Sequence, residues 1–143
     1  MGSRRKARAI ALQILYELDC TTHRAEEALA HLATEKAVPQ EVINFSEQLI
    51  RGVLKNKTNL DDLIKCFAPA FPVEQMAAID RNILRLAIFE ILFNNKTPFK
   101  VAINEAVELA KTFGSDSSSQ LVNGVLGSIV TKYGVRKSQV RKL

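Results

Sequence analysis

Residues 73 to about 93 constrain the fold most strongly, because this segment is apolar around most of the circumference of a helix. A helix that is apolar on nearly all sides needs other elements packed around it. Its polar residues gather in one narrow strip that contains Glu74, Arg81 and Arg85, with Asp80 beside it. The sequence therefore predicts a helix at the centre of a helical bundle.

The rest of the chain has helical periodicity, and no run alternates as a half-buried strand does. We therefore expect an all-α protein. The segment from Pro69 to Pro72 interrupts the pattern and is the one plausible boundary between two halves. The expected helices begin near residues 3, 23, 39, 60, 73, 98 and 118.

Side chains at two of the expected helix starts are suited to capping. Ser3 and Asn59 precede the first and fourth helices, and their oxygens can accept hydrogen bonds from the first free N–H groups. We expect both residues to be N-caps.

Two glycines interrupt otherwise good helices, each at a cost of roughly 1 kcal/mol relative to alanine. They are Gly52 and Gly124, and both lie in similar apolar hexamers. The close approach of another helix explains why a side chain is absent at these positions. The similarity of the hexamers fits either two related halves or a chance likeness of two amphipathic helices.

Composition excludes several classes of protein. The 143 residues, 47% hydrophobic and 24% charged, are typical of a globular domain, and no apolar run approaches the roughly 18 residues of a membrane helix. The basic N-terminus lacks a cleavage site for a signal peptide, so we expect a cytoplasmic protein that does not enter a membrane. Cys20 and Cys66 lie far apart, and we expect two buried thiols rather than a disulfide.

Motifs of enzymatic chemistry are absent from the sequence. It contains no glycine-rich phosphate loop, no nucleophile elbow and no helical pair of zinc-binding histidines. Asp61 and Asp62 are adjacent, so they point to different faces of a helix and cannot share an acid/base site. His23 and His31 are best explained as incidental surface residues. We expect no catalytic residue, no cofactor and no metal.

Positive charge is concentrated at the two ends of the chain. All 15 acidic residues fall between Glu17 and Asp116, whereas nine of the 20 basic residues lie outside that range. Such clusters attract phosphate groups, although solvated ends that maintain solubility explain them equally well. The nine residues are Arg4, Arg5, Lys6, Arg8, Lys132, Arg136, Lys137, Arg141 and Lys142.

One face of the first helix combines a basic head with apolar side chains. Arg5, Ala9, Leu12 and Tyr16 follow at helical spacing, and this face points away from the expected core stripe. An exposed aromatic side chain next to positive charge can attract phosphate and stack on an unpaired base. Alternatively, Leu12 and Tyr16 pack under the second helix. The expected core stripe consists of Ala7, Ala11, Ile14, Leu15 and Leu18.

Several segments resemble the NusB family of bacterial transcription antitermination factors, and the likeness covers nearly the whole chain. The run from Val101 to Gly114, followed by Leu121 to Leu126, is the most specific of them. The N-terminal domains of RsmB-type ribosomal RNA methyltransferases share this pattern, but the chain ends where a methyltransferase domain would begin. The other matching segments are residues 4–8, 11–16, 52–53 and 80–87 with Glu90.

The resemblance implies a single non-catalytic domain over residues 1–143, with two three-helix subdomains at about 1–68 and 73–134 and a basic tail at 135–143. It also implies binding of boxA RNA jointly with NusE, a small-subunit ribosomal protein, in an antitermination complex with RNA polymerase. The RNA contacts of the family match Arg4, Arg5, Lys6, Arg8 and Tyr16. Its contacts with NusE match Glu74, Asp80, Ser117 and Leu121.

The chain departs from the family pattern at the start of the last helix. Many members have an aromatic residue where Leu121 stands and an acidic one where Ser117 stands, which predicts a weaker or differently shaped contact with NusE. RNA binding by the basic tail is a hypothesis from its charge alone. The alternatives are a helical interaction or homodimerisation module without RNA binding, and a detached methyltransferase accessory domain.

Overall fold

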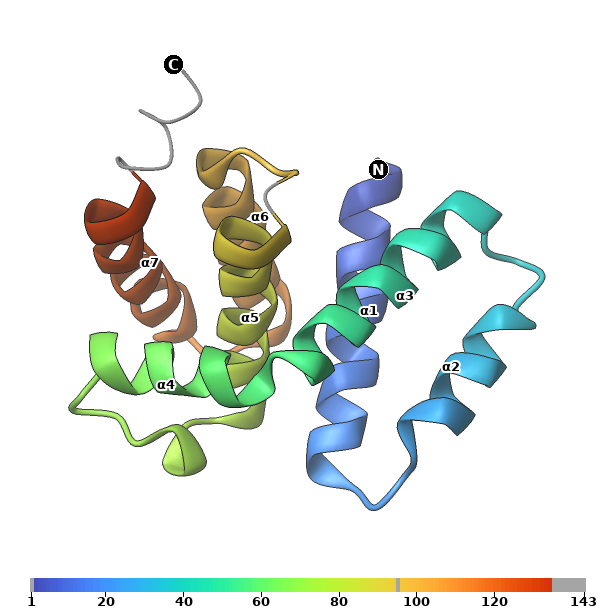
Figure 1. Cartoon of the computed structure of the whole chain (residues 1–143), viewed down its shortest axis with the longest axis horizontal. Helices are drawn as coiled ribbons and strands as arrows, with labels where there is room; N and C mark the ends of the chain where they lie inside the picture. Colours follow the sequence, from blue (N-terminus) through green and yellow to red (C-terminus); the bar gives the residue numbers. More distant parts are fainter. Residues whose placement is uncertain (1, 95, 135–143) are drawn as a thin grey trace.

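The structure, a computed structural model, describes residues 2–94 and 96–134. The described residues form seven α-helices and no strand, which confirms the all-α class. Figure 1 shows their arrangement. The helices are α1 (Ser3–Cys20), α2 (Ala25–Ala33), α3 (Gln40–Lys55), α4 (Lys57–Phe67), α5 (Ala78–Ile88), α6 (Phe99–Phe113) and α7 (Ser118–Ile129).

Helix α5 is the centre of the bundle. It packs against α1 and α3 on one side and against α4, α6 and α7 on the other. Ile83, Leu84 and Ile88 in this helix are fully buried, and Leu86 is nearly so. The expectation of a central apolar helix is thereby confirmed.

The apolar segment is not one continuous helix, however. A short 3₁₀ turn, η1 (Val73–Gln75), is followed by extended backbone at Met76 and Ala77 before α5 begins. After α5 the chain widens into a π-helical turn, η2 (Phe89–Asn94). At this break the Arg81 side chain donates to the carbonyl oxygens of Met76 and Val73, and that of Val73 also accepts from the Met76 amide.

The helices lie in two groups in Figure 1, with α1, α2 and α3 on one side and α4 to α7 on the other. The sequence suggested a division at residues 69–72, which would place α4 with the N-terminal helices. By its contacts α4 belongs with the C-terminal group, since it packs mainly on α5 and α7.

Both cap predictions were wrong. Helix α1 already includes Ser3, whose hydroxyl donates to Glu41 Oε1 at 2.7 Å instead of capping the helix. Helix α4 begins at Lys57, so Asn59 lies inside its first turn. In both cases the apolar periodicity located the helix but not its first residue.

The two glycines differ in their surroundings. A Cβ atom on Gly52 would overlap the ring of Phe89, which confirms the close approach of η2 to α3. No heavy atom lies within 4 Å of the corresponding position on Gly124, so the prediction of a close approach there was wrong.

The surface departs from expectation at the cysteines. Cys20 and Cys66 are exposed rather than buried, because they occupy the last turns of α1 and α4.

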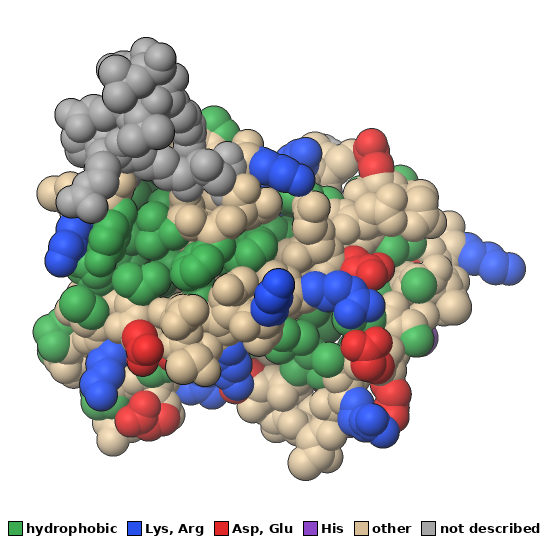
Figure 2. Space-filling model, in the orientation of Figure 1, with side chains coloured by type: hydrophobic (Ala, Val, Ile, Leu, Met, Phe, Trp, Pro, Cys, Tyr) green, Lys and Arg blue, Asp and Glu red, His purple; other side chains and the backbone are tan. Residues whose placement is uncertain are grey.

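Figure 2 shows hydrophobic side chains gathered over the C-terminal group of helices, whereas basic and acidic side chains intermingle over the N-terminal group. No helix among the described residues is both long and apolar enough to cross a bilayer.

Candidate nucleic-acid interface

The first turn of α1 carries three consecutive exposed cations, Arg4, Arg5 and Lys6. The Arg4 guanidinium lies 4.2 Å from the centre of the Phe45 ring, a cation–π contact that orients it. Cations at a helix N-terminus oppose the helix dipole, and this turn has no acidic residue to offset them. The arrangement therefore does not favour the helix by itself, and a counter-charge comes instead from Glu105 on α6, which binds Arg5.

Arg5 is held by a carboxylate of α6. Its Nε and Nη2 donate to Glu105 Oε1 and Oε2 at 3.0 and 2.7 Å. This hydrogen bonding raises the pKa of Arg5 and lowers the pKa of Glu105. The Arg5 side chain remains 51% exposed, so a phosphate can approach the guanidinium from solvent.

The structure places Arg8, expected at the RNA surface, in the interior instead. Its Nε and Nη2 donate to Glu90 Oε1 and Oε2 at 2.8 and 2.9 Å, and both residues are buried. Thr97 donates a further hydrogen bond to Glu90 Oε2 at 3.0 Å. The reason is geometric: this side of α1 faces α5 and η2, where Glu90 supplies the opposite charge.

On the remaining face of α1, neither sequence alternative describes both side chains. Leu12 is fully buried, whereas Tyr16 is 41% exposed. A cleft of about 160 Å³ lies between α1 and α6, with Arg5 and Ala9 on one wall and Leu109 and Phe113 on the other. Arg8, Glu105 and Glu108 also line this cleft, which therefore combines charges of both signs with apolar side chains.

The four residues expected to contact NusE lie in two places. Glu74 is exposed on η1, and Asp80 is 7% exposed in the first turn of α5. The Asp80 Oδ1 atom is buried without a hydrogen-bond partner in the structure. Ser117 is exposed and precedes α7, and Leu121 is half-buried in its first turn.

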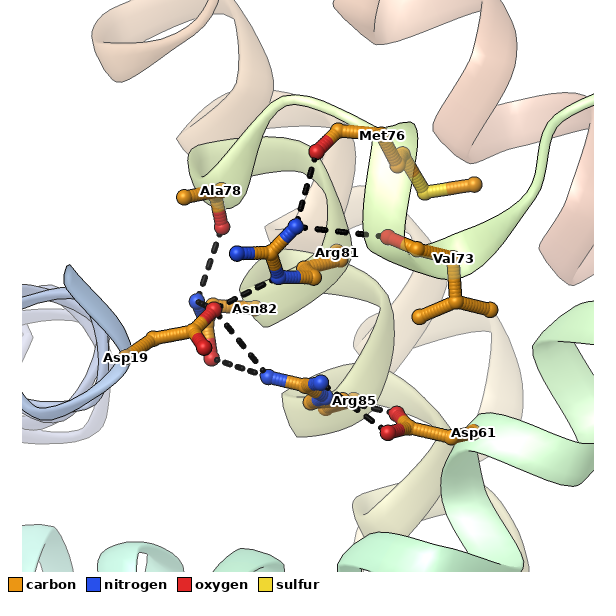
Figure 3. A network of polar contacts seen from close by, with 8 residues as sticks. All are labelled: Asp19, Asp61, Val73, Met76, Ala78, Arg81, Asn82 and Arg85. Atoms are coloured by element: carbon orange, nitrogen blue, oxygen red, sulfur yellow. Dashed lines mark hydrogen bonds and ion pairs between the residues drawn. The ribbon is translucent and has the colours of Figure 1, made fainter.

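A network of charged side chains ties the end of α1 to α5 and α4 (Figure 3). Asp19 Oδ2 accepts from Arg81 Nε at 2.6 Å, from Asn82 Nδ2 at 2.9 Å and from Arg85 Nη1 at 3.3 Å. Arg85 also donates to both carboxylate oxygens of Asp61, at 2.7 and 3.0 Å. Burial raises the pKa of Asp19, but these hydrogen bonds and positive charges outweigh it and lower the pKa overall.

Sequence reasoning missed the acidic partners of these arginines. Glu90 and Glu105 stand out in the sequence only as members of the segments that match the family. A lone carboxylate in the apolar stretch around residue 90 was a usable signal, because a buried charge needs a partner.

The tail at 135–143 lies outside the described residues. Among the residues that the structure does describe, no group of three or more potential metal ligands comes together.

Comparisons with known proteins agree with this architecture. The sequence model of the NusB family matches residues 5–131. A transcription antitermination protein NusB from Dehalococcoides mccartyi is 56% identical over 127 residues, which cover 89% of each chain. Its counterpart from a Roseiflexus species is 48% identical and covers 94% of this chain and 96% of its own.

Solved structures show the same fold. T. maritima NusB superposes with a TM-score of 0.81 at 30% identity, covering 92% of both chains. A chain from a crystal structure of antitermination factors NusB and NusE in complex with dsRNA superposes with a TM-score of 0.83 at 23% identity, covering 92% of this chain and 98% of that one.

Proposed function

Because this chain belongs to the NusB family of transcription antitermination proteins, we propose that it binds boxA-type single-stranded RNA jointly with NusE. The observation that carries the proposal is the row of exposed cations on the first turn of α1, next to the cleft between α1 and α6.

The RNA surface consists of Arg4, Arg5 and Lys6, with Tyr16 further along the same helix. The forked pairing of Arg5 with Glu105 supports this assignment, because a guanidinium that binds two carboxylate oxygens can bind two phosphate oxygens in the same geometry. Arg8 contributes indirectly, since its buried pair with Glu90 holds α1 against the rest of the bundle.

The surface for NusE consists of Glu74, Asp80, Ser117 and Leu121. The exposed carboxylate of Glu74 supports this assignment, whereas Asp80 is 7% exposed and its Oδ1 is buried, so a partner reaches that atom only if the first turn of α5 shifts. The hydroxyl of Ser117 and the half-buried side chain of Leu121 offer one polar and one apolar contact at the start of α7.

The protein thereby acts as a non-enzymatic adaptor in the cytoplasm. RNA and NusE bound to it form part of the complex that helps RNA polymerase resist termination. The apolar surface over the C-terminal helices in Figure 2 leaves room for a further protein contact, including a homodimer.

Fluorescence anisotropy tests the proposal directly. A boxA-containing single-stranded RNA and a scrambled RNA are titrated with the chain, alone and with its cognate NusE, at two salt concentrations. We expect tighter binding of the boxA RNA, and a further gain in affinity when NusE is present. Equal binding of both RNAs, unaffected by NusE and lost at moderate salt, would favour the interaction-module alternative.

Arg5→Gln and Arg51→Gln form a matched pair of variants. Both arginines are exposed to a similar degree, 51% and 53%, and each is paired with glutamate, but Arg51 lies on α3. We expect Arg5→Gln to weaken boxA binding about tenfold and Arg51→Gln to change it by less than about twofold. Sedimentation of the same samples measures whether the chain is a monomer or a dimer. Comparison with the anisotropy data then shows which of the two forms binds the RNA.

A further inference from the structure

Arg81 joins three separate parts of the chain. Its Nε donates to Asp19 Oδ2 on α1, and its Nη1 donates to the carbonyl oxygens of Met76 and Val73 at 2.9 and 3.3 Å. The side chain is only 15% exposed, so water competes little for these bonds. Figure 3 shows the guanidinium between the carboxylate and the two carbonyls.

The segment that receives these bonds has few of its own. The 3₁₀ turn η1 is three residues long, and the backbone is extended at Met76. The amides of Gln75 and Met76 donate to the carbonyl oxygen of Pro72, and that of Met76 also donates to Val73, so these bonds are local and do not fix the segment relative to α1. The side chains of Val73 and Met76 are buried in the core, and the bonds from Arg81 add a direct polar link from this segment to Asp19 on α1.

In the sequence, Glu74 lies between Val73 and Met76, the two residues whose carbonyl oxygens accept hydrogen bonds from Arg81. We propose that Arg81 is a positioning residue, which holds the segment of Glu74 at a fixed place relative to α1 and so prepares the NusE surface. This inference rests on the proposed binding of NusE at Glu74.

The same link connects the two proposed binding surfaces. Asp19 is near the C-terminal end of α1, and the RNA-binding cations lie at the other end of that helix. Because α1 is rigid and Arg81 binds its C-terminal end, this helix sets the distance between the RNA surface at its N-terminal end and Glu74. Fixing this geometry beforehand lowers the ordering cost when RNA and NusE bind together.

Hydrogen exchange on the free protein tests the positioning step without NusE. Arg81→Lys keeps the positive charge but loses the planar fork that reaches three acceptors. We expect the amides of Gln75 and Met76 to exchange about tenfold faster in this variant. Arg85→Lys is the matched control, because Arg85 also binds Asp19 but makes no hydrogen bond to residues 73–76.

A double-mutant cycle then tests the consequence for binding. Glu74→Gln is expected to weaken NusE binding about fivefold in the wild-type background but less than twofold in the Arg81→Lys background. The Arg85→Lys background should retain the full fivefold effect. RNA binding by the chain alone should be the same in Arg81→Lys as in the wild type, which a general loss of structure would not allow.

The outcomes separate the inference from the function on which it rests. Unchanged exchange at Gln75 and Met76, or an equal cost of Glu74→Gln in the wild-type and Arg81→Lys backgrounds, would overturn the positioning role while leaving NusE binding intact. If the wild-type chain failed to bind NusE, the proposed function and its extension to binding would both fall, whereas faster exchange would still show that Arg81 holds the segment.

Discussion

Two arginines on the same helix, three residues apart, form the same kind of pair in opposite surroundings. Arg5 binds Glu105 and Arg8 binds Glu90, each through two hydrogen bonds of 2.7 to 3.0 Å. The Arg5 side chain is 51% exposed, whereas that of Arg8 is 5% exposed. Burial, and not bond geometry, separates the two pairs.

This difference assigns the two pairs to different tasks. An exposed ion pair contributes little stability, because water and salt compete for both charges. Glu105 is only 13% exposed, but it also lies 3.7 Å from Arg8 Nη1, so it keeps a positive neighbour when a ligand phosphate takes its place on Arg5. A buried pair cannot be exchanged in this way, because removing one partner leaves a desolvated charge. Arg5 is thus open to solvent, as its proposed role requires, and Arg8 secures helix α1 from the inside.

Arg8→Met gives the largest expected effect, because it breaks the buried pair of Arg8 and Glu90 (the inner pair) and leaves Glu90 charged and buried. We expect the free energy of unfolding, measured by urea denaturation, to fall by about 3–5 kcal/mol. The double variant Arg8→Met/Glu90→Leu should recover most of this loss, since no unpaired charge remains. A loss below about 1 kcal/mol in the single variant would mean that water reaches Glu90.

Asp19→Asn tests the charged network at the C-terminal end of α1. The burial of this network is intermediate between those of Arg5 and Arg8. The carboxylate is 13% exposed and accepts from three donors, two of them arginines. Loss of its charge should lower the free energy of unfolding by about 1–2 kcal/mol, less than for the inner pair. Asp62→Asn, at an exposed position on α4, is the control and should leave the urea midpoint unchanged.

The stability contributed by Asp19 should depend on pH in a defined direction. Its folded-state pKa lies below the ordinary value of 3.8, so the unfolded chain binds the proton more readily. The stabilisation is fully present above that value and is lost as the pH falls through the lower, folded-state pKa. Urea midpoints measured between pH 5 and about pH 2 should therefore fall more steeply for the wild type than for Asp19→Asn. Parallel curves would contradict this role.

Glu105→Gln gives the smallest expected effect, because it weakens the pair of Arg5 and Glu105 (the outer pair). The urea midpoint should fall slightly, because Glu105 also lies 3.7 Å from Nη1 of the buried Arg8, while RNA affinity rises two- to threefold (roughly), since Arg5 no longer exchanges a carboxylate for phosphate. Glu108→Gln removes an exposed charge from the same helix and serves as the control. If both variants raised RNA affinity equally, the cause would be net charge alone, and the outer pair would have no special role.

Helix positions were largely readable from the sequence, because they depend on local periodicity. The central helix and the buried stripe of α7, including Val122, Leu126 and Ile129, follow from apolar spacing alone. Gly52 was equally readable, since a costly glycine inside a helix has few explanations other than a close neighbour such as Phe89.

The pairing of charges was not readable, because it depends on residues distant in the chain. Arg8 has the same sequence neighbourhood as Arg5, and only the packing of α1 on α3 and α5 decides that it is interior. The same packing on two sides buries Leu12, which a single apolar stripe had left outside the core. The backbone break at Met76 is unreadable for another reason: its donor, Arg81, lies only five residues further along, but a side chain that binds a carbonyl oxygen leaves no mark in the apolar spacing.

The long separation of these pairs bears on the order in which the protein folds. Glu90 lies 82 residues after Arg8, and Glu105 lies 100 residues after Arg5. Contacts so distant in the chain form late, because long loops must close first. Helix α1 is the first to leave the ribosome, yet Arg8 finds its partner only after η2 has been synthesised, and Arg5 only after α6. An interrupted chain that stops before residue 90 therefore lacks the buried partner that fixes α1, and only the completed protein presents the finished basic surface.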